Sequence, residues 1–549
     1  MRILVFITLF VLSSFSVISQ VTMRDTLILW QHFDYEMDEN FSLANYSESD
    51  IVTTEFEGIV LENELVKICL IPAFGARIIS FVYKPSGLEQ LYQNPIGTPY
   101  QIGSNIFYHD WLMVYGGIFP TFPESEHGKY WNTPWNYEIT EQSDDKITVS
   151  MWLKDELDNP KRPSQYNNGV TGITCYFNVS LEVNKPFFKV DVELENDASS
   201  DRYEYWTCIT FAPGSEIGNT FTPSNTEMIV PIDHYEVGWN PNNWLNSLDE
   251  VVRAAGPRVQ VYDKLAHLSN WRAQGIAYAY PTMEKDFYGV INHENENGLF
   301  RLSSDQTQTP GLKFWTWGDT QGLAADPNNF NNEARPYIEM WSGVSQQFFK
   351  DAFLAANESV QWTETYLPTV GVPSVSFMNE EIAFGSSLNE SELKVHAFLP
   401  ISTDSYTLEI KILEGTNEVY SETQTIALQT LDASFFDLNL TDLNLTDGSF
   451  EVKLSMLKNA TQLYTESYLY EVNNSSAFEP RLTVTNGAIQ LAFEDAEVRT
   501  IYLHDLYGRR INRVVTSTKE ASVSYPEAGV YLINIVNDKT RWSKKISIR

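Results

Sequence analysis

The sequence predicts an all-β protein organised around a large antiparallel sheet. Many segments alternate apolar and polar residues, for example KITVSMWLKD (146–155) and PFFKVDVELEN (186–196), which is typical of strands with one buried face. No stretch keeps the 3.6-residue period of a helix, and no repeat of roughly 20–50 residues is visible. Turn residues such as Pro85-Ser86-Gly87 separate the strands.

Composition bounds the number of domains and the kind of partner. At 549 residues the chain is long enough for several domains, because single cores stop growing near ~250–300 residues. Hydrophobic residues make up 43% of the chain and aromatic residues 13%, enough to bury real cores. The formal net charge of −35 argues against nucleic-acid binding. A polyanionic substrate would need a local basic pocket, whereas a neutral glycan meets no such barrier.

The first residues have the pattern of a signal peptide. Residues 1–19 contain one early arginine, an apolar run over 3–12 and a Val-x-Ser ending. No other stretch is long and apolar enough to span a membrane. No cysteine directly follows the end of the predicted signal peptide at residue 19, so a lipoprotein anchor is not expected. We therefore expect an exported, soluble protein without a transmembrane segment.

The three cysteines carry no predicted chemistry. Cys69, Cys175 and Cys208 each lie inside an apolar, strand-like run, where a buried thiol is the usual outcome. Their odd number and irregular spacing fit neither a disulfide framework nor a zinc site. We expect three free, buried side chains.

The chain divides by changes in pattern. Residues 20–56 are acidic and weakly periodic, so we expect an N-terminal extension that adds an edge strand. Residues 57–372 form the main β-domain. Within it, 102–139 is a loop system dense in Trp, Tyr and His, a candidate wall of a binding cleft. Residues 220–267 are a less regular, Asn- and Trp-rich insertion.

The character of the chain changes after residue 372. Residues 373–472 have short strands and Asn/Ser/Thr/Asp-rich turns, which predict an immunoglobulin-like β-sandwich. Residues 473–478 form a linker. The last module, 479–549, is basic and β-rich.

The stretch 281–343 has the strongest site signal in the main domain. It contains TPGLKFWTWGD (309–319) and ARPYIEMWSG (334–343), with a single glutamate among aromatic residues. Period-two alternation places Lys313, Trp315 and Trp317 on one face of a strand. A lysine is rarely buried in a core, so Lys313 favours a cleft on this face. Packing of the two tryptophans against the core is the alternative. We expect this stretch to form part of an aromatic sugar-binding cleft.

The last module resembles a known sorting domain. The matching residues are LYGRR (506–510), GVYLINI (529–535) and KKISI (544–548). They resemble the C-terminal sorting domain of the type IX secretion system of Bacteroidetes. The resemblance implies export across the outer membrane by that machinery, with release or surface attachment. A terminal binding module is the alternative.

Six stretches of the main domain have a shared resemblance: LENELVKICLIPAFGARI, YGGIFPTFPESEH, DFYGVINHENENG, TPGLKFWTWGD, YIEMWSG and ESVQWTETYLP. In this order they resemble the galactose-mutarotase-like supersandwich, in particular a secreted bacterial family within it, over most of 57–372. It implies a large antiparallel β-supersandwich, followed here by the immunoglobulin-like β-sandwich and a small β-sandwich sorting domain. The superfamily includes epimerases and domains of hydrolases and lyases, so the fold alone leaves the activity open.

The resemblance also implies a base and an acid. In mutarotases a late-strand glutamate takes the proton of the anomeric hydroxyl and a histidine protonates the ring oxygen. Motif order places Glu339 at the first position and His127 at the second. A mutarotase has a second histidine on the mid-domain strand, where this chain has Trp206-Thr207, which puts simple mutarotation in doubt.

Further residues are candidate sugar contacts, each with a structural alternative. Glu339 has the alternative of an ion pair with Arg335 or Arg77, and His293 that of a solvated turn. The predicted substrate-binding residues are Trp206, Lys313, Trp315, Trp317, His109, Arg77 and His293. No metal or cofactor motif is present, although the resemblance leaves room for a calcium ion.

Three functions remain open from the sequence. The first is an enzyme acting on an oligosaccharide by Glu/His acid–base chemistry, through epimerisation, lyase-type elimination or hydrolysis. In the lyase case, Lys313 or Arg77 would neutralise a uronate carboxylate. The second is a non-catalytic glycan-binding protein with the same aromatic cleft. The third is a structural or adhesive protein of the cell surface.

Overall fold

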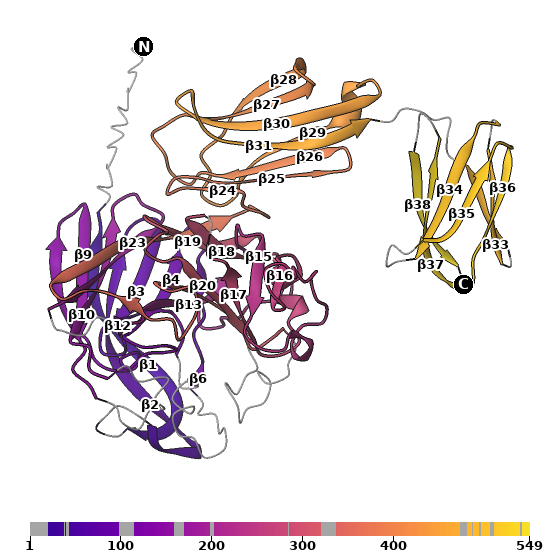
Figure 1. Ribbon diagram of the computed structural model, residues 1–549. Helices are drawn as coiled ribbons and strands as arrows, with labels where there is room; N and C mark the ends of the chain where they lie inside the picture. Colours follow the sequence, from indigo (N-terminus) through magenta and orange to yellow (C-terminus); the bar gives the residue numbers. More distant parts are fainter. Residues whose placement is uncertain are drawn as a thin grey trace, which may run out of the picture. The chain divides into compact units, whose positions relative to one another are not determined.

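A computed structural model shows the chain as a set of antiparallel sheets (Figure 1). It describes residues 20–37, 39, 43–97, 115–158, 169–197, 202–283, 285–319, 336–472, 480–485, 487–493, 496–505, 510–537 and 541–548. The chain is 60% strand and 3% helix, which confirms the all-β prediction. The described helices are short 3₁₀ turns, namely η3 (Pro241–Asn243), η4 (Lys264–Ala266), η5 (Leu268–Asn270) and η7 (Leu440–Leu443).

The larger sheet has 13 described strands and carries most of the candidate residues. In order across the sheet they are β16 (Val259–Val261), β15 (His234–Val237), β17 (Gly275–Tyr280), β20 (Gly311–Thr316), β21 (Ile338–Gly343), β13 (Trp206–Ser215), β5 (Leu88–Leu91), β4 (Arg77–Tyr83), β3 (Val66–Ile71), β2 (Leu43–Glu62), β1 (Thr22–Met37) and β6 (Ile96–Gly97), with β7 (Ile118–Thr121) paired to β13 and β4. Segments far apart in sequence therefore meet at β21, β13 and β7.

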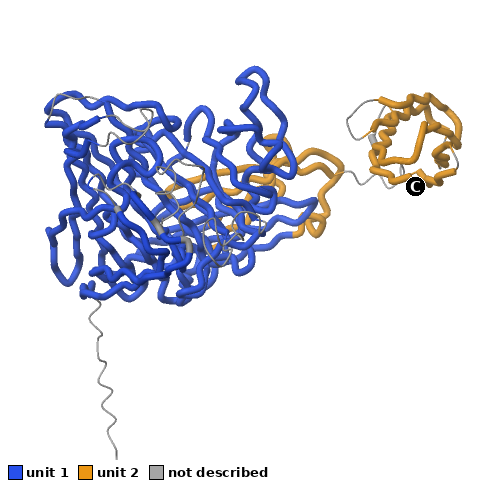
Figure 2. The backbone as a smooth tube through the Cα atoms, turned by 90° about the horizontal axis from the view of Figure 1, so that it is seen from below, with its two compact units in different colours: residues 1–407, 425–438, 458–460 blue, residues 408–424, 439–457, 461–549 orange. Residues whose placement is uncertain are grey.

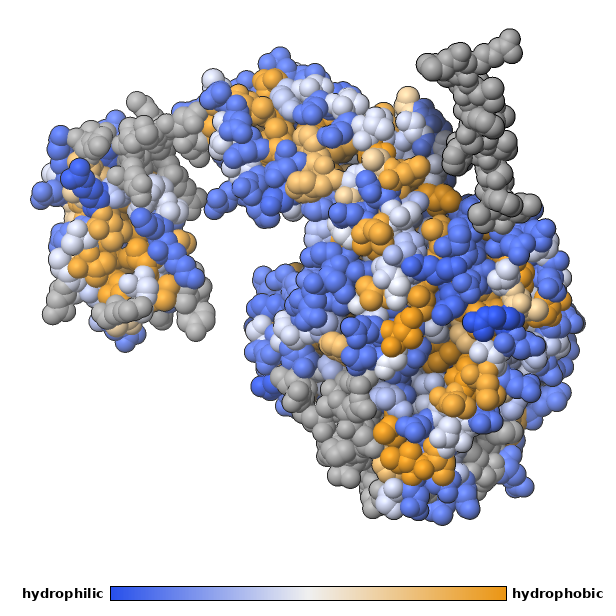
Figure 3. Space-filling model, turned by 180° about the vertical axis from the view of Figure 1, so that it is seen from behind, coloured by the Kyte–Doolittle hydropathy of each residue, from blue (hydrophilic) through white to orange (hydrophobic). Residues whose placement is uncertain are grey.

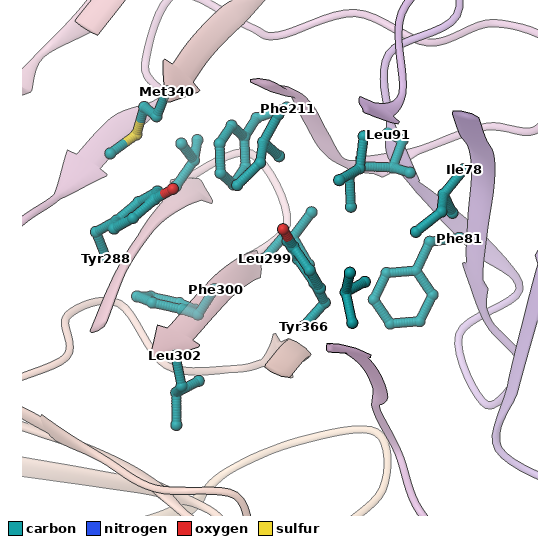
Figure 4. Close-up of a cluster of buried hydrophobic side chains, with 14 of the residues drawn as sticks. Ile78, Phe81, Leu91, Phe211, Tyr288, Leu299, Phe300, Leu302, Met340 and Tyr366 are labelled. Atoms are coloured by element: carbon teal, nitrogen blue, oxygen red, sulfur yellow. The ribbon is translucent and has the colours of Figure 1, made fainter. Parts of the chain in front are cut away.

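The second sheet has eight described strands and supplies the other wall of the core. Their order is β14 (Glu227–Ile229), β18 (Phe287–Asn292), β19 (Asn297–Ser303), β23 (Glu358–Val370), β11 (Phe188–Asn196), β10 (Ile173–Glu182), β9 (Lys146–Lys154) and β8 (Asn136–Gln142). Figure 4 shows side chains of the two sheets in one cluster, with Phe211 and Met340 from the larger sheet near Tyr288 and Phe300 from the smaller. Sandwich packing of this kind buries one face of each sheet.

The described strands of the N-terminal segment belong to the larger sheet. β1 pairs with β2 from Thr22↔Glu62 to Met37↔Leu43, and β2 pairs with β3. The sheet therefore begins well before residue 57. Trp30 is 1% exposed, because the acidic segment still alternates and turns this indole inward. The insertion at 220–267 likewise contributes β14, β15 and β16 in addition to its irregular turns.

The described chain separates into two compact units (Figure 2). The first comprises residues 1–407, 425–438 and 458–460, and the second comprises 408–424, 439–457 and 461–549. Besides the two large sheets, the first unit holds the pair β12 (Arg202–Tyr203) and β22 (Ala352–Phe353) and a sheet of β24 (Phe377–Met378), β25 (Ala383–Asn389), β26 (Glu392–Phe398) and β29 (Ser434–Asn439).

The second unit contains two groups of strands. A four-stranded sheet of β28 (Asn417–Thr425), β27 (Tyr406–Glu414), β30 (Gly448–Lys458) and β31 (Thr461–Val472) lies almost wholly in this unit. The last module has two described sheets. One is formed by β32 (Arg481–Thr485), β33 (Ala488–Ala492) and β36 (Glu520–Ser524). The other is formed by β35 (Arg510–Thr516), β34 (Arg499–Asp505), β37 (Gly529–Val536) and β38 (Arg541–Ile548). Ile489, Ile501 and Ile533 lie in its own hydrophobic core.

The surface is of mixed polarity, and the three cysteines are buried. Hydrophobic and hydrophilic residues are interspersed over the face seen in Figure 3. Cys69, Cys175 and Cys208 are free and buried, as predicted. Across the described ranges, no helix has the length and apolar character needed to cross a bilayer.

Candidate functional site

Strands β20 and β21 turn the predicted residues to one face of the larger sheet. Lys313 lies opposite Trp341, and Trp315 lies opposite Glu339, in antiparallel register. Because side chains alternate along a strand, these four share a face, while Phe314 enters the core between the sheets. The strand alternation predicted from the sequence is confirmed here.

This outer face carries a second hydrophobic cluster, separate from the core between the sheets. It is rich in aromatic residues drawn from many strands and from the loops after β7 and β21. Its members include Trp30, Phe74, Tyr92, Tyr115, Phe119, Trp131, Trp206, Tyr278, Trp315, Trp317, Tyr337, Trp341 and Phe348. Ionisable side chains within such an environment have strongly altered protonation equilibria.

Glu339 lies in the middle of this cluster and is 4% exposed. The Trp341 indole N–H donates to its Oε2 at 2.8 Å, and the Tyr337 hydroxyl donates to its Oε1 at 3.1 Å. Burial raises the pKa of Glu339 above its usual value, while Lys313 and the two donors oppose this rise. The carboxyl group is thus fixed in position with a raised pKa, as a general base requires.

Lys313 links this carboxyl group to a second one. Its ammonium lies 4.0 Å from the centre of the Trp341 ring and 4.6 Å from that of Phe348, both cation–π distances. The same Nζ is 3.9 Å from Oε2 of Glu126. Burial raises the pKa of Glu126, Lys313 lowers it, and Glu339 raises it further. Two carboxyl groups therefore share one cation on the aromatic face.

His127 lies beside the same tryptophan. It is 7% exposed, and its ring centre is 5.4 Å from that of Trp341 and 5.3 Å from that of Trp131. Trp341 therefore contacts both His127 and Glu339. The predicted acid and base belong to one cluster, and their roles stay a prediction.

Trp206 is wholly buried in this cluster. Its indole covers β21 at Gly343, where an added Cβ would lie 2.2 Å from the ring. Its N–H is 3.4 Å from Oε2 of Glu204, whose Oε1 accepts a hydrogen bond from Ser125 at 2.5 Å. Burial raises the pKa of Glu204 to about 7. In this structure, Trp206 has the contacts of a packing residue.

Arg77 uses its guanidinium to hold the loop that carries Glu126 and His127. Its N–H groups donate to the backbone carbonyls of Gly116 at 2.5 Å, Trp131 at 3.0 Å and Phe74 at 3.3 Å. The group is fully buried, and burial lowers its pKa to about 9. Arg77 is therefore engaged with backbone and does not pair with Glu339.

Trp315 and Trp317 meet edge to face, with ring centres 4.2 Å apart. They are 9% and 6% exposed, and Trp315 also contacts Tyr337 at 5.9 Å. Both indoles are on the predicted face, packed within the aromatic cluster. Packing of each ring against its neighbours is what the described contacts support.

His293 lies elsewhere, in the turn between β18 and β19 of the smaller sheet. Its Nδ1 is 3.0 Å from Glu296 and its Nε2 is 3.0 Å from Glu227. The hydrogen bond to Glu227 raises the pKa of His293, with Glu296 adding to the effect. The structure does not bring His293 together with Glu339. His109 and Arg335 lie outside the described residues.

Sequence reasoning missed several members of the cluster. Glu126 directly precedes His127, and Glu204 lies two residues before Trp206, so both were next to residues already chosen. Trp341 was noted only as a neighbour of Glu339, and Phe348 was not noted. An acidic residue inside a dense aromatic run was the available signal, because such a residue must find a partner when buried.

No metal centre is evident in the described part of the chain, where no three His, Cys, Asp or Glu side chains are arranged to hold an ion. A bound calcium ion remains an expectation from the resemblance. Tight calcium sites need six to eight oxygen ligands.

Two parts of the chain match known families. Residues 485–549 match the family described as a secretion system C-terminal sorting domain, and residues 37–167 match a domain of unknown function, DUF5107. The sorting domain confirms the prediction from LYGRR, GVYLINI and KKISI. The protein is therefore a type IX secretion substrate, exported to the cell surface or the extracellular space.

Solved structures with low sequence identity are also similar to this chain. A TPR-domain containing protein from Parabacteroides distasonis has 19% identity and a TM-score of 0.48, over 66% of this chain and 58% of that one. A galactose mutarotase-like protein from Clostridium acetobutylicum has 13% identity and a TM-score of 0.38, over 57% and 96%. One from Lactobacillus casei has 13% identity and a TM-score of 0.33, over 57% and 99%.

Proposed function

We propose that this secreted protein is a carbohydrate-active enzyme that uses Glu339 as its general base. The observation that carries the proposal is the environment of this carboxyl group. It is buried among aromatic side chains, oriented by Trp341 and Tyr337, and adjacent to Lys313 and Glu126. Aromatic side chains with a few positioned polar groups are typical of ligand sites.

The chemistry that suits this arrangement is proton transfer at a sugar. In ring opening, Glu339 would take the proton of the anomeric hydroxyl while the bond between the anomeric carbon and the ring oxygen breaks. The electron pair goes to the ring oxygen, which takes a proton from the acid, and an open-chain aldehyde results. The resemblance assigns the acid to His127. In hydrolysis the base would instead take a proton from the attacking water.

A non-catalytic glycan-binding role is the second candidate. One observation favours it: Trp206 occupies the position where the mutarotase resemblance places a second histidine, and an indole cannot transfer protons in that way. A glycan-binding protein would keep the aromatic face for contact with sugar rings and would not transfer protons. Binding without product formation would distinguish this role from catalysis.

A glycan panel tests the proposal. The secreted protein is incubated with neutral and acidic oligosaccharides, products are followed by mass spectrometry and anomeric NMR signals, and binding is followed by calorimetry. We expect Glu339→Gln to lower kcat/KM by about 10²–10⁴-fold with little change in binding, since it removes a general base. Glu227→Gln, on the smaller sheet, makes the same charge change and serves as the control. Normal turnover by Glu339→Gln overturns the assignment, and binding without any product favours the binder.

A further inference from the structure

Resting on the function proposed above, we infer that Glu126 is the acid that works with Glu339, and that the site takes a neutral glycan. The geometry points to a pair of carboxyl groups that share the Lys313 ammonium. Glu126 comes from the loop after β7, whereas Lys313 and Glu339 come from β20 and β21. Three separate segments thus meet on the aromatic face.

The sharing of Lys313 follows from strand register. Lys313 faces Trp341 across the β20–β21 ladder, and Glu339 is two residues before Trp341, so Lys313 and Glu339 are diagonal neighbours on one face. Diagonal neighbours in an antiparallel pair are about 7–8 Å apart at Cα, within reach of long side chains. The Lys313 ammonium is also 3.9 Å from Glu126. Each carboxyl group therefore interacts with the same positive charge.

The two carboxyl groups differ in what stabilises their charge. Glu339 accepts hydrogen bonds from Trp341 and Tyr337, which stabilise the ionised form. The Lys313 Nζ lies 3.9 Å from Oε2 of Glu126, a longer distance than either hydrogen bond to Glu339. The charge of Glu339 raises the pKa of Glu126 further. More groups therefore stabilise the ionised form of Glu339 than that of Glu126, which fits a base at Glu339 and an acid at Glu126.

Glu126 is also the carboxyl group that a ligand reaches first. Its side chain is 18% exposed, whereas Glu339 is 4% exposed. Its backbone has a φ of +63°, in the left-handed region that residues with a side chain rarely adopt. Such conformations are costly and are concentrated at functional sites.

The charge balance indicates the substrate class. Two carboxyl groups already compete for Lys313, and Arg77 is occupied by three backbone carbonyls. A uronate would bring a further carboxylate to a site where the ionised Glu339 already interacts with the charge of Lys313, within a chain of net charge −35. A neutral sugar brings no such repulsion. This argues against the uronate lyase chemistry that the sequence left open, in which Lys313 or Arg77 would neutralise the substrate.

The proposed step conserves atoms and charge. The Glu126 carboxyl donates its proton to the ring or glycosidic oxygen as the bond from that oxygen to the anomeric carbon breaks. In ring opening, Glu339 accepts the proton of the anomeric hydroxyl, whose oxygen forms the carbonyl double bond to that carbon. In hydrolysis, Glu339 accepts a proton of the attacking water, whose oxygen forms the new bond to that carbon. The pair ends with Glu339 protonated and Glu126 ionised, and proton exchange with water restores the starting state.

Two measurements test the inference. In the first, the secreted protein is assayed on cellohexaose, xylohexaose and mannohexaose, and on hexagalacturonate and hexamannuronate. We expect product only from neutral ligands. Glu126→Gln should lower kcat/KM by about 10²-fold and remove the alkaline limb of the pH profile. His127→Gln should keep that limb, and Glu227→Gln should match the wild type. The titratable and charged groups around the pair are Lys313, Tyr337, Cys208, His127, Glu204 and Arg77.

In the second, infrared difference spectra of wild type minus Glu126→Gln should show a protonated carboxyl band that persists above pH 4.5, the ordinary value for glutamate. This readout needs no substrate. Loss of the alkaline limb in His127→Gln, no protonated Glu126 band above pH 4.5, or turnover of uronates overturns the inference. Failure of every glycan would instead overturn the proposed function and the substrate class with it, and the infrared band would still decide the protonation of Glu126.

Discussion

Trp341 binds Glu339 and Lys313 at the same time. Its indole N–H donates to the Glu339 carboxyl at 2.8 Å, and the Lys313 ammonium lies 4.0 Å from the centre of its ring. One side chain therefore positions an anion at its edge and a cation at its face, as the charge distribution of an indole favours.

Trp341→Phe should raise the pKa of Glu339, because the lost N–H stabilises the ionised carboxylate. A hydrogen bond to a charged group is worth about 1.5–3 kcal/mol, so we expect the acid limb of kcat/KM to move up by about one to two pH units. Trp206→Phe is a matched control, since the Trp206 N–H is directed at Glu204 instead. An unchanged acid limb in Trp341→Phe would show that Glu339 does not control it.

Glu204 should make the protein less stable as the pH rises. Its folded pKa is about 7, above the ordinary value of 4.5, so its contribution to stability is fully present below pH 4.5 and is lost as pH rises through 7. A shift of this size corresponds to about 3 kcal/mol. Denaturant unfolding at pH 5 and pH 8 should show a smaller pH dependence in Glu204→Gln than in the wild type. An equal change of unfolding free energy between pH 5 and pH 8 in the two proteins would contradict the raised pKa of Glu204.

Arg301 on β19 and Glu364 on β23, two adjacent strands of the smaller sheet, form an ion pair of 2.9 Å, and both side chains are fully buried. Glu364 also accepts hydrogen bonds from the Trp362 indole and the Tyr366 hydroxyl. Arg301→Met alone should cost about 3–5 kcal/mol of unfolding free energy, because it leaves a buried charge without its partner. The double variant Arg301→Met/Glu364→Leu should cost less than the sum of the single changes. Additive losses in this cycle would exclude coupling.

Trp315→Ala distinguishes packing from a binding platform. Because Trp315 is 9% exposed, we expect a loss of about 3–5 kcal/mol in unfolding free energy. Trp239→Ala is the matched control, since Trp239 is 42% exposed and its loss should change stability by less than about 0.5 kcal/mol. Reduced glycan binding at unchanged stability in Trp315→Ala would identify a platform instead.

Much of the fold followed from local patterns, and much of the site did not. Alternation predicted that Lys313, Trp315 and Trp317 share one face, as the structure shows, whereas the position of Glu339 on the same face came from strand register. Alternation could not show that Glu126 lies beside Lys313, because that contact joins segments far apart in the chain. It also could not separate His293 from the site, since membership of the smaller sheet depends on strand pairing.

The sequence by itself determined the all-β class, the shared face of Lys313, Trp315 and Trp317, and the sorting domain, predicted at 479–549 and matched over 485–549, because these depend on local alternation and short motifs. Only the tertiary structure decided that β1 and β2 extend the larger sheet, that Arg77 is bound to backbone carbonyls, and that Glu126 and Glu339 share Lys313. Strand order and loop packing bring these groups together through pairing over long sequence separations, and the period of a single strand contains no information about its neighbours.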